Sequence, residues 1–210
     1  KIEIIDETKK DVPFDYENSL IDLNSAFTDK VFKILIKKDY SLKKPLIIYH
    51  STDNKINSTN INLRLDFELG ENSYLKLIDY FSNSTAKNFI KIFYNFNLEK
   101  NSILKNYKVD KFRNNNLKYS FNNIEQKNNS VSETFILSAG SDYIKNEINC
   151  NLNGEYSSAF INGIFSLKQN QQHEIRTIIN HLVENTKSYQ LIKSVLKESS
   201  KAVYQGKIFV

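Results

Sequence analysis

The sequence predicts an all-β protein, and it favours a solenoid over a sandwich or a barrel. Apolar and polar residues alternate in many short segments, most clearly at 61–69 ("INLRLDFEL"). This alternation is typical of strands that bury one face. The segments follow one another at near-regular spacing, without the long return connection that a sandwich needs. Asn occupies many of the turns between them, and stacked strands accommodate ladders of Asn well.

The N-terminal part has a different pattern. Residues 15–27 ("DYENSLIDLNSAF") place Leu20, Leu23 and Phe27 at the i, i+3 and i+7 positions, which predicts a short amphipathic helix with these side chains on its apolar face. After Asp29 the period changes to two. We therefore expect residues 1–30 to form an N-terminal segment with a short helix, and residues 31–210 to form the β-solenoid core.

Along the core, we expect strands in a series of short apolar or alternating runs. They lie at 31–38, 45–50, 61–69, 73–81, 88–98, 117–124, 132–140, 142–152, 157–167, 174–183 and 202–210. The Asn-Gly pairs at 153–154 and 162–163 predict tight turns. Residues 186–201 fit either a strand or a helix, and propensity alone favours a helix.

The chain ends within the apolar segment 202–210, and it contains no Met. A soluble protein rarely ends in the middle of a buried strand, because the next neighbour of that strand would be missing. We therefore expect the chain to be a piece of a longer protein, with a solenoid core that is incomplete at its C-terminal end.

Composition argues against two classes of partner. The net charge is +5, but the lysines are scattered and Arg occurs only at positions 64, 113 and 176, whereas nucleic-acid-binding proteins more often cluster basic residues. No apolar run approaches the roughly 18 residues of a membrane span. We therefore expect neither a nucleic acid nor a membrane as partner. The single cysteine, Cys150, suits a reducing compartment.

Cys150 is the one candidate site residue, and two interpretations stay open. It lies in "INCNLNG", where Ile148, Cys150 and Leu152 share one face of a predicted strand. It is either a small core residue, since free Cys is often buried, or a thiol that faces the interior and takes up sulfur or binds metal as a thiolate.

Other titratable residues show no catalytic or metal-binding spacing. We expect the three histidines, His50, His173 and His181, to be structural or exposed. Asp66 and Glu68 share one strand face, as paired carboxylates of a glycoside hydrolase would, but a solvated outer face explains them better.

The C-terminal third of the chain contains a set of motif residues that can be compared with known families. They are Leu152, Gly154, Thr177, His181, Thr186, Ser188, Gln190, Lys193 and the run 202–208 ("AVYQGKI"). Through them the chain resembles the SufB/SufD family of iron–sulfur cluster assembly proteins. The likeness extends from about Leu23 to Val210 and is most specific in 173–210. Within the family, Tyr204-Gln205-Gly206 looks more like SufD. Cys150, in contrast, falls where SufB proteins can carry a sulfur-accepting cysteine.

The resemblance implies a right-handed parallel β-helix, with a strand rather than a helix after Thr186. It implies a non-enzymatic, SufD-like scaffold subunit with a SufB-like paralogue and a SufC-like ATPase as partners in a hetero-oligomer, or a homodimer in isolation. It further implies no cofactor bound by this piece, an iron–sulfur cluster only in the assembled complex, and a place in the cytoplasm or the plastid stroma. Two alternatives remain: a SufB-like subunit with Cys150 as sulfur acceptor, and a β-helix protein that acts on or binds polysaccharide.

Overall fold

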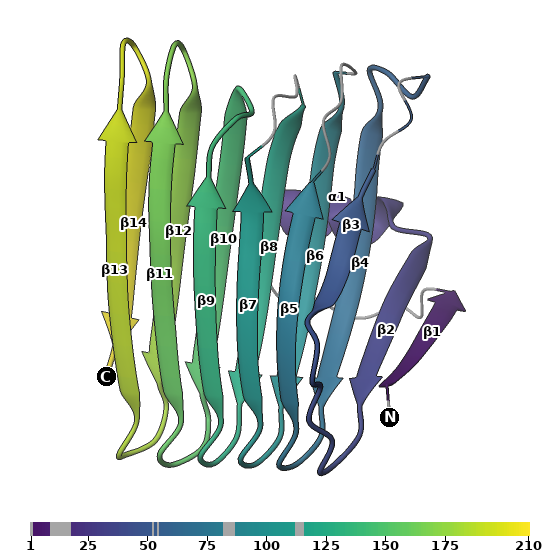
Figure 1. The fold of residues 1–210 in the computed structure, drawn as a ribbon, viewed down its shortest axis with the longest axis vertical. Helices are drawn as coiled ribbons and strands as arrows, with labels where there is room; N and C mark the ends of the chain where they lie inside the picture. Colours follow the sequence, from purple (N-terminus) through teal and green to yellow (C-terminus); the bar gives the residue numbers. More distant parts are fainter. Residues whose placement is uncertain (1, 9–17, 52, 54, 82–86, 112–115) are drawn as a thin grey trace.

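The structure is a computed structural model that describes residues 2–8, 18–51, 53, 55–81, 87–111 and 116–210. It is a parallel β-solenoid of two packed sheets (Figure 1). In sheet order, the eight-stranded sheet contains β1 (Ile2–Thr8), β2 (Lys30–Ile36), β4 (Asn60–Leu69), β6 (Phe89–Leu98), β8 (Leu117–Gln126), β10 (Tyr143–Leu152), β12 (Gln172–His181) and β14 (Lys201–Phe209). The six-stranded sheet contains β13 (Lys187–Leu196), β11 (Ser158–Leu167), β9 (Val131–Ser138), β7 (Ile103–Asp110), β5 (Tyr74–Phe81) and β3 (Leu46–His50).

The coil is right-handed. In Figure 1 the nearer strands run upward and the farther strands run downward, while the chain advances from right to left. Parallel crossover connections take this hand almost without exception, because of the twist of the strands. The predicted right-handed parallel β-helix is confirmed.

Each turn of the solenoid has nearly the same length. Phe89, Leu117, Tyr143, Gln172 and Lys201 are register partners in successive strands, and the differences between their numbers are 28, 26, 29 and 29 residues. The repeat was not readable in the sequence, because side chains at equivalent positions differ in type. β1 pairs with β2 in the antiparallel direction and so ends the parallel stack at its N-terminal side.

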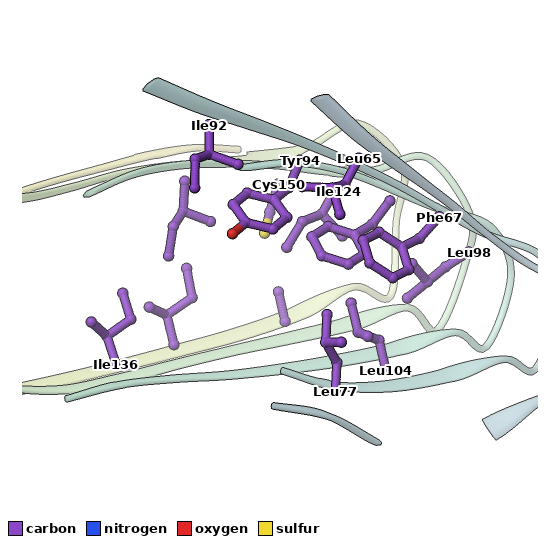
Figure 2. Close-up of a cluster of buried hydrophobic side chains, with 14 of the residues drawn as sticks. Leu65, Phe67, Leu77, Ile92, Tyr94, Leu98, Leu104, Ile124, Ile136 and Cys150 are labelled. Carbon is purple, nitrogen blue, oxygen red and sulfur yellow. The ribbon is translucent and has the colours of Figure 1, made fainter. Parts of the chain in front are cut away.

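The core lies between the two sheets and consists of inward-facing aliphatic and aromatic side chains. Phe67 and Phe96 stack with ring centroids 4.8 Å apart, and Tyr94 lies beside Phe96. Figure 2 shows Phe67 and Tyr94 with Leu77, Leu104 and other buried side chains that come from both sheets. The alternation read from the sequence at 61–69 is confirmed, since Leu65, Phe67 and Leu69 are buried.

The turns use Asn as the sequence predicted. Asn72, Asn101, Asn129 and Asn185 have φ angles between 56° and 59°, a left-handed conformation that Asn tolerates better than most residues. Asn101 Nδ2 donates to Asn72 Oδ1 (2.8 Å), so that stacked turns are joined by amide ladders. This arrangement stabilises the edges of the solenoid.

The helix α1 (Ser19–Phe27) forms where it was predicted, but it buries a different face. Asn18 caps its N-terminus by accepting from the Leu20 N–H (3.1 Å). The helix packs on the outer face of the eight-stranded sheet through Ile21 and Asn24 rather than through Leu23 and Phe27. Asn24 decides this orientation, because its amide donates to the backbone carbonyl groups of two strands, at Lys91 (2.9 Å) and Leu63 (3.3 Å).

One local prediction was wrong, and one segment that the residue pattern left open is a strand. The Asn-Gly pair at 162–163 lies in the middle of β11 and makes no turn. A Cβ at Gly163 would lie inside the filled core, 2.9 Å from Ile192 Cδ1 and 3.2 Å from Ile175 Cδ1, so these side-chain ends would have to shift. The helix that propensity favoured at 186–201 is instead strand β13, which pairs in parallel with β11 along its whole length. That pairing outweighs the weak local preference for a helix.

The C-terminal segment is a strand, as expected. β14 is the last strand of the eight-stranded sheet, and Tyr204, Ile208 and Phe209 are exposed. The division of the chain at residue 30 stays a prediction. Within the N-terminal segment, however, β1 already belongs to the eight-stranded sheet.

Candidate functional site

Cys150 lies on β10 with its side chain in the interior, among the buried residues of Figure 2. Its register neighbours are Ile124 on β8 and Ile179 on β12, and the thiol is fully buried. Burial raises the pKa of the thiol to about 12. The thiol is therefore protonated at neutral pH, whereas the thiolate is the form that attacks sulfur or binds metal.

One polar neighbour, Ser132, lies against this thiol. The Ser132 hydroxyl donates its proton to Gln126 Oε1 (2.7 Å), and its contact with the thiol acts to lower the pKa of Cys150. Gln126 in turn donates to the backbone carbonyl groups of Ser130 and Ser158. Burial outweighs the effect of Ser132, so the thiol stays neutral. Cys150 thus faces the interior, as both interpretations required, and its sulfur-accepting role stays a prediction.

A buried charged cluster crosses the core near its N-terminal end, and sequence reasoning did not find it. Asp79 of β5 is its centre. One carboxylate oxygen of Asp79 lies 2.6 Å from His50 Nε2, and the other accepts from the Tyr94 hydroxyl (2.6 Å) and from Lys108 Nζ (3.0 Å). The Asp79 and Lys108 side chains have no exposed surface, and the Lys108 ammonium also donates to Asn122 Oδ1.

The electrostatics of this cluster favour an ion pair. Burial by itself would raise the pKa of Asp79, but the Lys108 charge and the His50 hydrogen bond outweigh it and hold the pKa well below its usual range. Burial lowers the pKa of Lys108, and Asp79 opposes that effect. The Lys108 ammonium also lies 3.6 Å from the centroid of the Tyr94 ring, where a cation is attracted.

A second buried pair lies beside the first. Lys118 of β8 donates to Asp110 of β7, and its ammonium lies 3.6 Å from the Phe81 ring centroid. The His50 ring stacks on the same Phe81 ring at 4.2 Å. The Lys118–Asp110 pair joins the two sheets, whereas Asp79 and Lys108 are neighbours in the six-stranded sheet and reach the other sheet through Tyr94 and Asn122. Each charge is close to an opposite charge.

Among the described residues of these pairs, His50 has the most exposed side chain, at 12%. His50 lines an apolar pocket of about 330 Å³ between β2 and β3, with Phe32, Ile48 and Leu65 among its walls. A His–Asp pair can move protons, and the Tyr94 hydroxyl lies 3.4 Å from His50 Nε2. That hydroxyl donates to Asp79, however, and burial raises its pKa well above the usual value, so it is a poor nucleophile. The arrangement therefore suits a structural role better than catalysis.

The other two histidines are structural, as predicted. His173 is buried, with its ring nitrogens bound to Ser138 Oγ (2.9 Å) and to the Ser141 carbonyl oxygen (2.8 Å). Burial lowers its pKa, so the ring is neutral at neutral pH. His181 lies between the hydroxyl groups of Thr186 and Ser188.

The prediction that Asp66 and Glu68 lie on the outer face of their strand is also confirmed. Asp66 forms a two-point ion pair with Arg64, and Glu68 pairs with Lys33. Within the described part of the chain, no three His, Cys, Asp or Glu side chains lie close enough together to hold a metal ion. In the same part, α1 is too short and too polar to cross a membrane.

Comparison with known proteins agrees with this solenoid. The family model described as "SUF system FeS cluster assembly, SufBD core domain" matches residues 50–210, which is more than half of the chain. The chain belongs to the SufBD family. The resemblance read from the motifs is therefore confirmed, and with it the strand after Thr186.

Among curated SufBD proteins, the chain is similar to the "Iron-sulfur cluster assembly protein SufD" of Escherichia coli (strain K12). The two are 26% identical over 196 residues, which cover 90% of this chain and 45% of the E. coli protein. The chain thus spans about half the length of this relative. The likeness supports a SufD-like chain.

The structure also explains what the SufBD-like motif residues do in this chain. Thr177, Gln190 and Tyr204 come from three successive strands, and both hydroxyl groups donate to the same Gln190 Oε1, at 2.5 and 2.6 Å. They join β12, β13 and β14 across the two sheets. The motif is therefore a structural clamp of the last turns.

Sequence reasoning missed Asp79, Lys108, Lys118 and Asp110 for an identifiable reason. Each occupies an inward position of its strand, as Asp79 does after Leu75 and Leu77. A charged residue at an apolar position of an alternating pattern was the available signal. The partner of Asp79 could not be found, because Lys108 lies on the next turn, 29 residues along the chain. Asp110 and Lys118 are only eight residues apart, but they lie on consecutive strands of different sheets, so their pairing depends on the fold.

Proposed function

We propose that this chain is a non-enzymatic scaffold subunit of an iron–sulfur cluster assembly complex, and that it is SufD-like. The observation that carries the proposal is the similarity to the E. coli iron–sulfur cluster assembly protein SufD over 90% of the chain. The match of residues 50–210 to the SufBD core domain supports it. The predicted scaffold role is consistent with an interior in which the charges are paired and Cys150 is protonated.

Its partners in this proposal are a SufB-like paralogue and a SufC-like ATPase. Within the hetero-oligomer the solenoids of the SufB-like and SufD-like subunits pair, and a homodimer forms when the chain is alone. The iron–sulfur cluster is cargo of the assembled complex, and this piece binds no cofactor by itself. The working compartment is the cytoplasm or the plastid stroma, which agrees with a single, unpaired cysteine.

We expect the tagged full-length protein to co-purify with SufB and SufC from its own source when the three are co-expressed. Association should survive moderate salt, because subunits of a stable complex bury large apolar interfaces. Size-exclusion chromatography with mass determination measures the complex, and omission of SufB is the control. A folded protein that elutes alone in the presence of both partners contradicts the proposal.

A second candidate is a SufB-like subunit in which Cys150 accepts sulfur. It is favoured by one observation: Cys150 precedes Leu152 and Gly154 and faces the interior beside Ser132. The raised pKa argues against it, since the thiolate is needed.

Replacement of Cys150 separates the two candidates. We expect Cys150→Ser to leave cluster assembly in the reconstituted complex within about twofold of wild type, because the protonated thiol serves packing. The measurement is cluster formation on an apo-acceptor, followed by absorbance, with Ser132→Ala as a matched control beside the thiol. Loss of assembly in a folded Cys150→Ser complex, with Ser132→Ala active, would instead establish the SufB-like role.

The polysaccharide alternative is not proposed further. Its expected carboxylate pair, Asp66 and Glu68, is held in separate ion pairs with Arg64 and Lys33. Membership of the SufBD family supports cluster assembly instead.

A further inference from the structure

A pocket of about 370 Å³ lies between α1 and the outer face of the eight-stranded sheet. It is lined by Leu23 and Phe27 of α1, Asn60 and Asn62 of β4, and Phe89 and Lys91 of β6. We call it the Lys91 pocket. Its volume is at the lower end of the range of about 300–1,000 Å³ that is usual for small-molecule sites.

The floor of the pocket is set by strand register. Asn60 pairs with Phe89, and Asn62 pairs with Lys91, on the parallel strands β4 and β6. All four alternate with the inward residues of these strands and so project outward. Because neighbouring strands lie about 4.8 Å apart, the Asn62 amide and the Lys91 side chain start side by side.

Lys91 is a buried cation without an anion. The residue is 3% exposed, and its amine makes no hydrogen bond or ion pair with any residue in the described ranges. Its one attractive contact there is the Phe89 ring, whose centroid is 5.1 Å from Nζ. Burial lowers the pKa of this amine. Buried lysines are otherwise almost always paired, because desolvating a charge is costly.

Asn62 has a buried side-chain oxygen, Oδ1, that lacks a hydrogen-bond donor in the described part of the chain. A buried carbonyl oxygen of this kind is stabilised by an N–H donor. A ligand that carries a negative group beside an N–H group would therefore provide an anion for Lys91 and a hydrogen-bond donor for Asn62.

The wall of the pocket is apolar. Leu23 is 42% exposed and Phe27 is 64% exposed, although both belong to the apolar face predicted for the helix. Asn24 turns that face away from the sheet, toward the pocket and solvent. An apolar group in the pocket would cover these two side chains and Phe89.

We propose that the Lys91 pocket binds an N-acylated apolar amino acid with a free carboxylate, a chemistry that the C-terminal residue of a polypeptide also presents. The carboxylate pairs with the Lys91 ammonium, and the amide N–H donates to Asn62 Oδ1. The apolar side chain packs on Leu23, Phe27 and Phe89. This site is independent of the scaffold function, since it involves neither Cys150 nor the interior.

The test uses the full-length protein and N-acetyl-L-phenylalanine at neutral pH, with isothermal titration calorimetry as the readout. We expect binding in the micromolar to millimolar range, and at least about tenfold weaker binding of N-acetyl-L-phenylalaninamide, which lacks the charge. A tetrapeptide that ends in phenylalanine identifies the source. Tighter binding of the peptide indicates a polypeptide C-terminus, and equal or weaker binding indicates a small molecule.

Variants distinguish a binding role of Lys91 from a structural one. Lys91→Met should weaken carboxylate binding about tenfold or more without lowering the melting temperature, because it removes an unpaired buried charge. Phe27→Ala should also weaken binding, and Lys207→Met, on an exposed position of the same sheet, should not. Equal binding of the acid and the amide overturns the proposal. So does a Lys91→Met protein that is less stable than wild type, since Lys91 would then be paired within the protein.

Discussion

Replacement of Asp79 by Asn is expected to lower the free energy of unfolding by about 3–5 kcal/mol. The substitution removes the anion that accepts from Lys108 and Tyr94, and it leaves the Lys108 ammonium buried without a counter-charge. Breaking a buried pair from one side is far more costly than removing it altogether. Urea unfolding followed by circular dichroism measures the change.

Two further variants make this expectation specific. The double variant Asp79→Asn/Lys108→Met should recover most of the loss, because no unpaired charge remains. Asp6→Asn breaks an exposed pair with Lys30 and should change stability by less than about 1 kcal/mol. If Asp79→Asn were as mild as Asp6→Asn, the buried ion pair would not contribute as the geometry indicates.

The same carboxylate determines part of the acid sensitivity. The pKa of Asp79 is lowered in the folded protein, so its contribution is fully present above the unfolded pKa of about 4 and is lost as the pH falls below that value. Between pH 6 and pH 3, the free energy of unfolding should therefore fall less steeply with decreasing pH in Asp79→Asn than in wild type.

Replacement of Gly154 by Ala is expected to destabilise the solenoid by about 2–3 kcal/mol. A Cβ at this position would lie 2.1 Å from the backbone N of Asn128 and 2.3 Å from the carbonyl C of Lys127, in the neighbouring turn. That turn cannot move away freely, because the Lys127 N–H donates to the Leu98 carbonyl and the Asn129 N–H to the Glu155 carbonyl. Urea unfolding again measures the effect.

Gly206→Ala is the matched control for this substitution. A Cβ at Gly206 would approach chiefly the Tyr204 hydroxyl, at 2.6 Å, which is the far end of a side chain that can rotate. We expect a loss below about 1 kcal/mol there. Equal stability of the two glycine variants would show that the stacked turns are not as closely packed as the structure indicates.

Local sequence patterns predicted the structure correctly where the outcome depends only on residues close together in the chain. The alternation at 61–69 predicted β4, because one face of that strand is buried whatever lies opposite. Asn was expected in the turns, and Asn72 and Asn101 lie there in the left-handed conformation, because φ is a local property. The spacing of apolar residues in 15–27 predicted a helix, and α1 forms within that segment.

The same patterns were unreliable where the next turn of the solenoid decided the outcome. The face that α1 buries depends on carbonyl groups of β4 and β6 that Asn24 reaches. β13 is a strand because β11 lies beside it, and the Asn-Gly pair at 162–163 continues a strand because β11 pairs there with both β9 and β13. None of these neighbours lies within 25 residues along the chain, as the turn length of about 26–29 residues requires.

The sequence by itself determined the all-β class, the family, and Cys150 as an inward-facing residue, because alternation, turn residues and short motifs are local. Tertiary structure alone decided the protonated state of Cys150, the pairing of Asp79 with Lys108, and the unpaired Lys91 beside Asn62. The physical reason is the geometry of a solenoid. Side chains that meet in its core or on its face come from different turns, and their charge and burial depend on partners that no local pattern can identify.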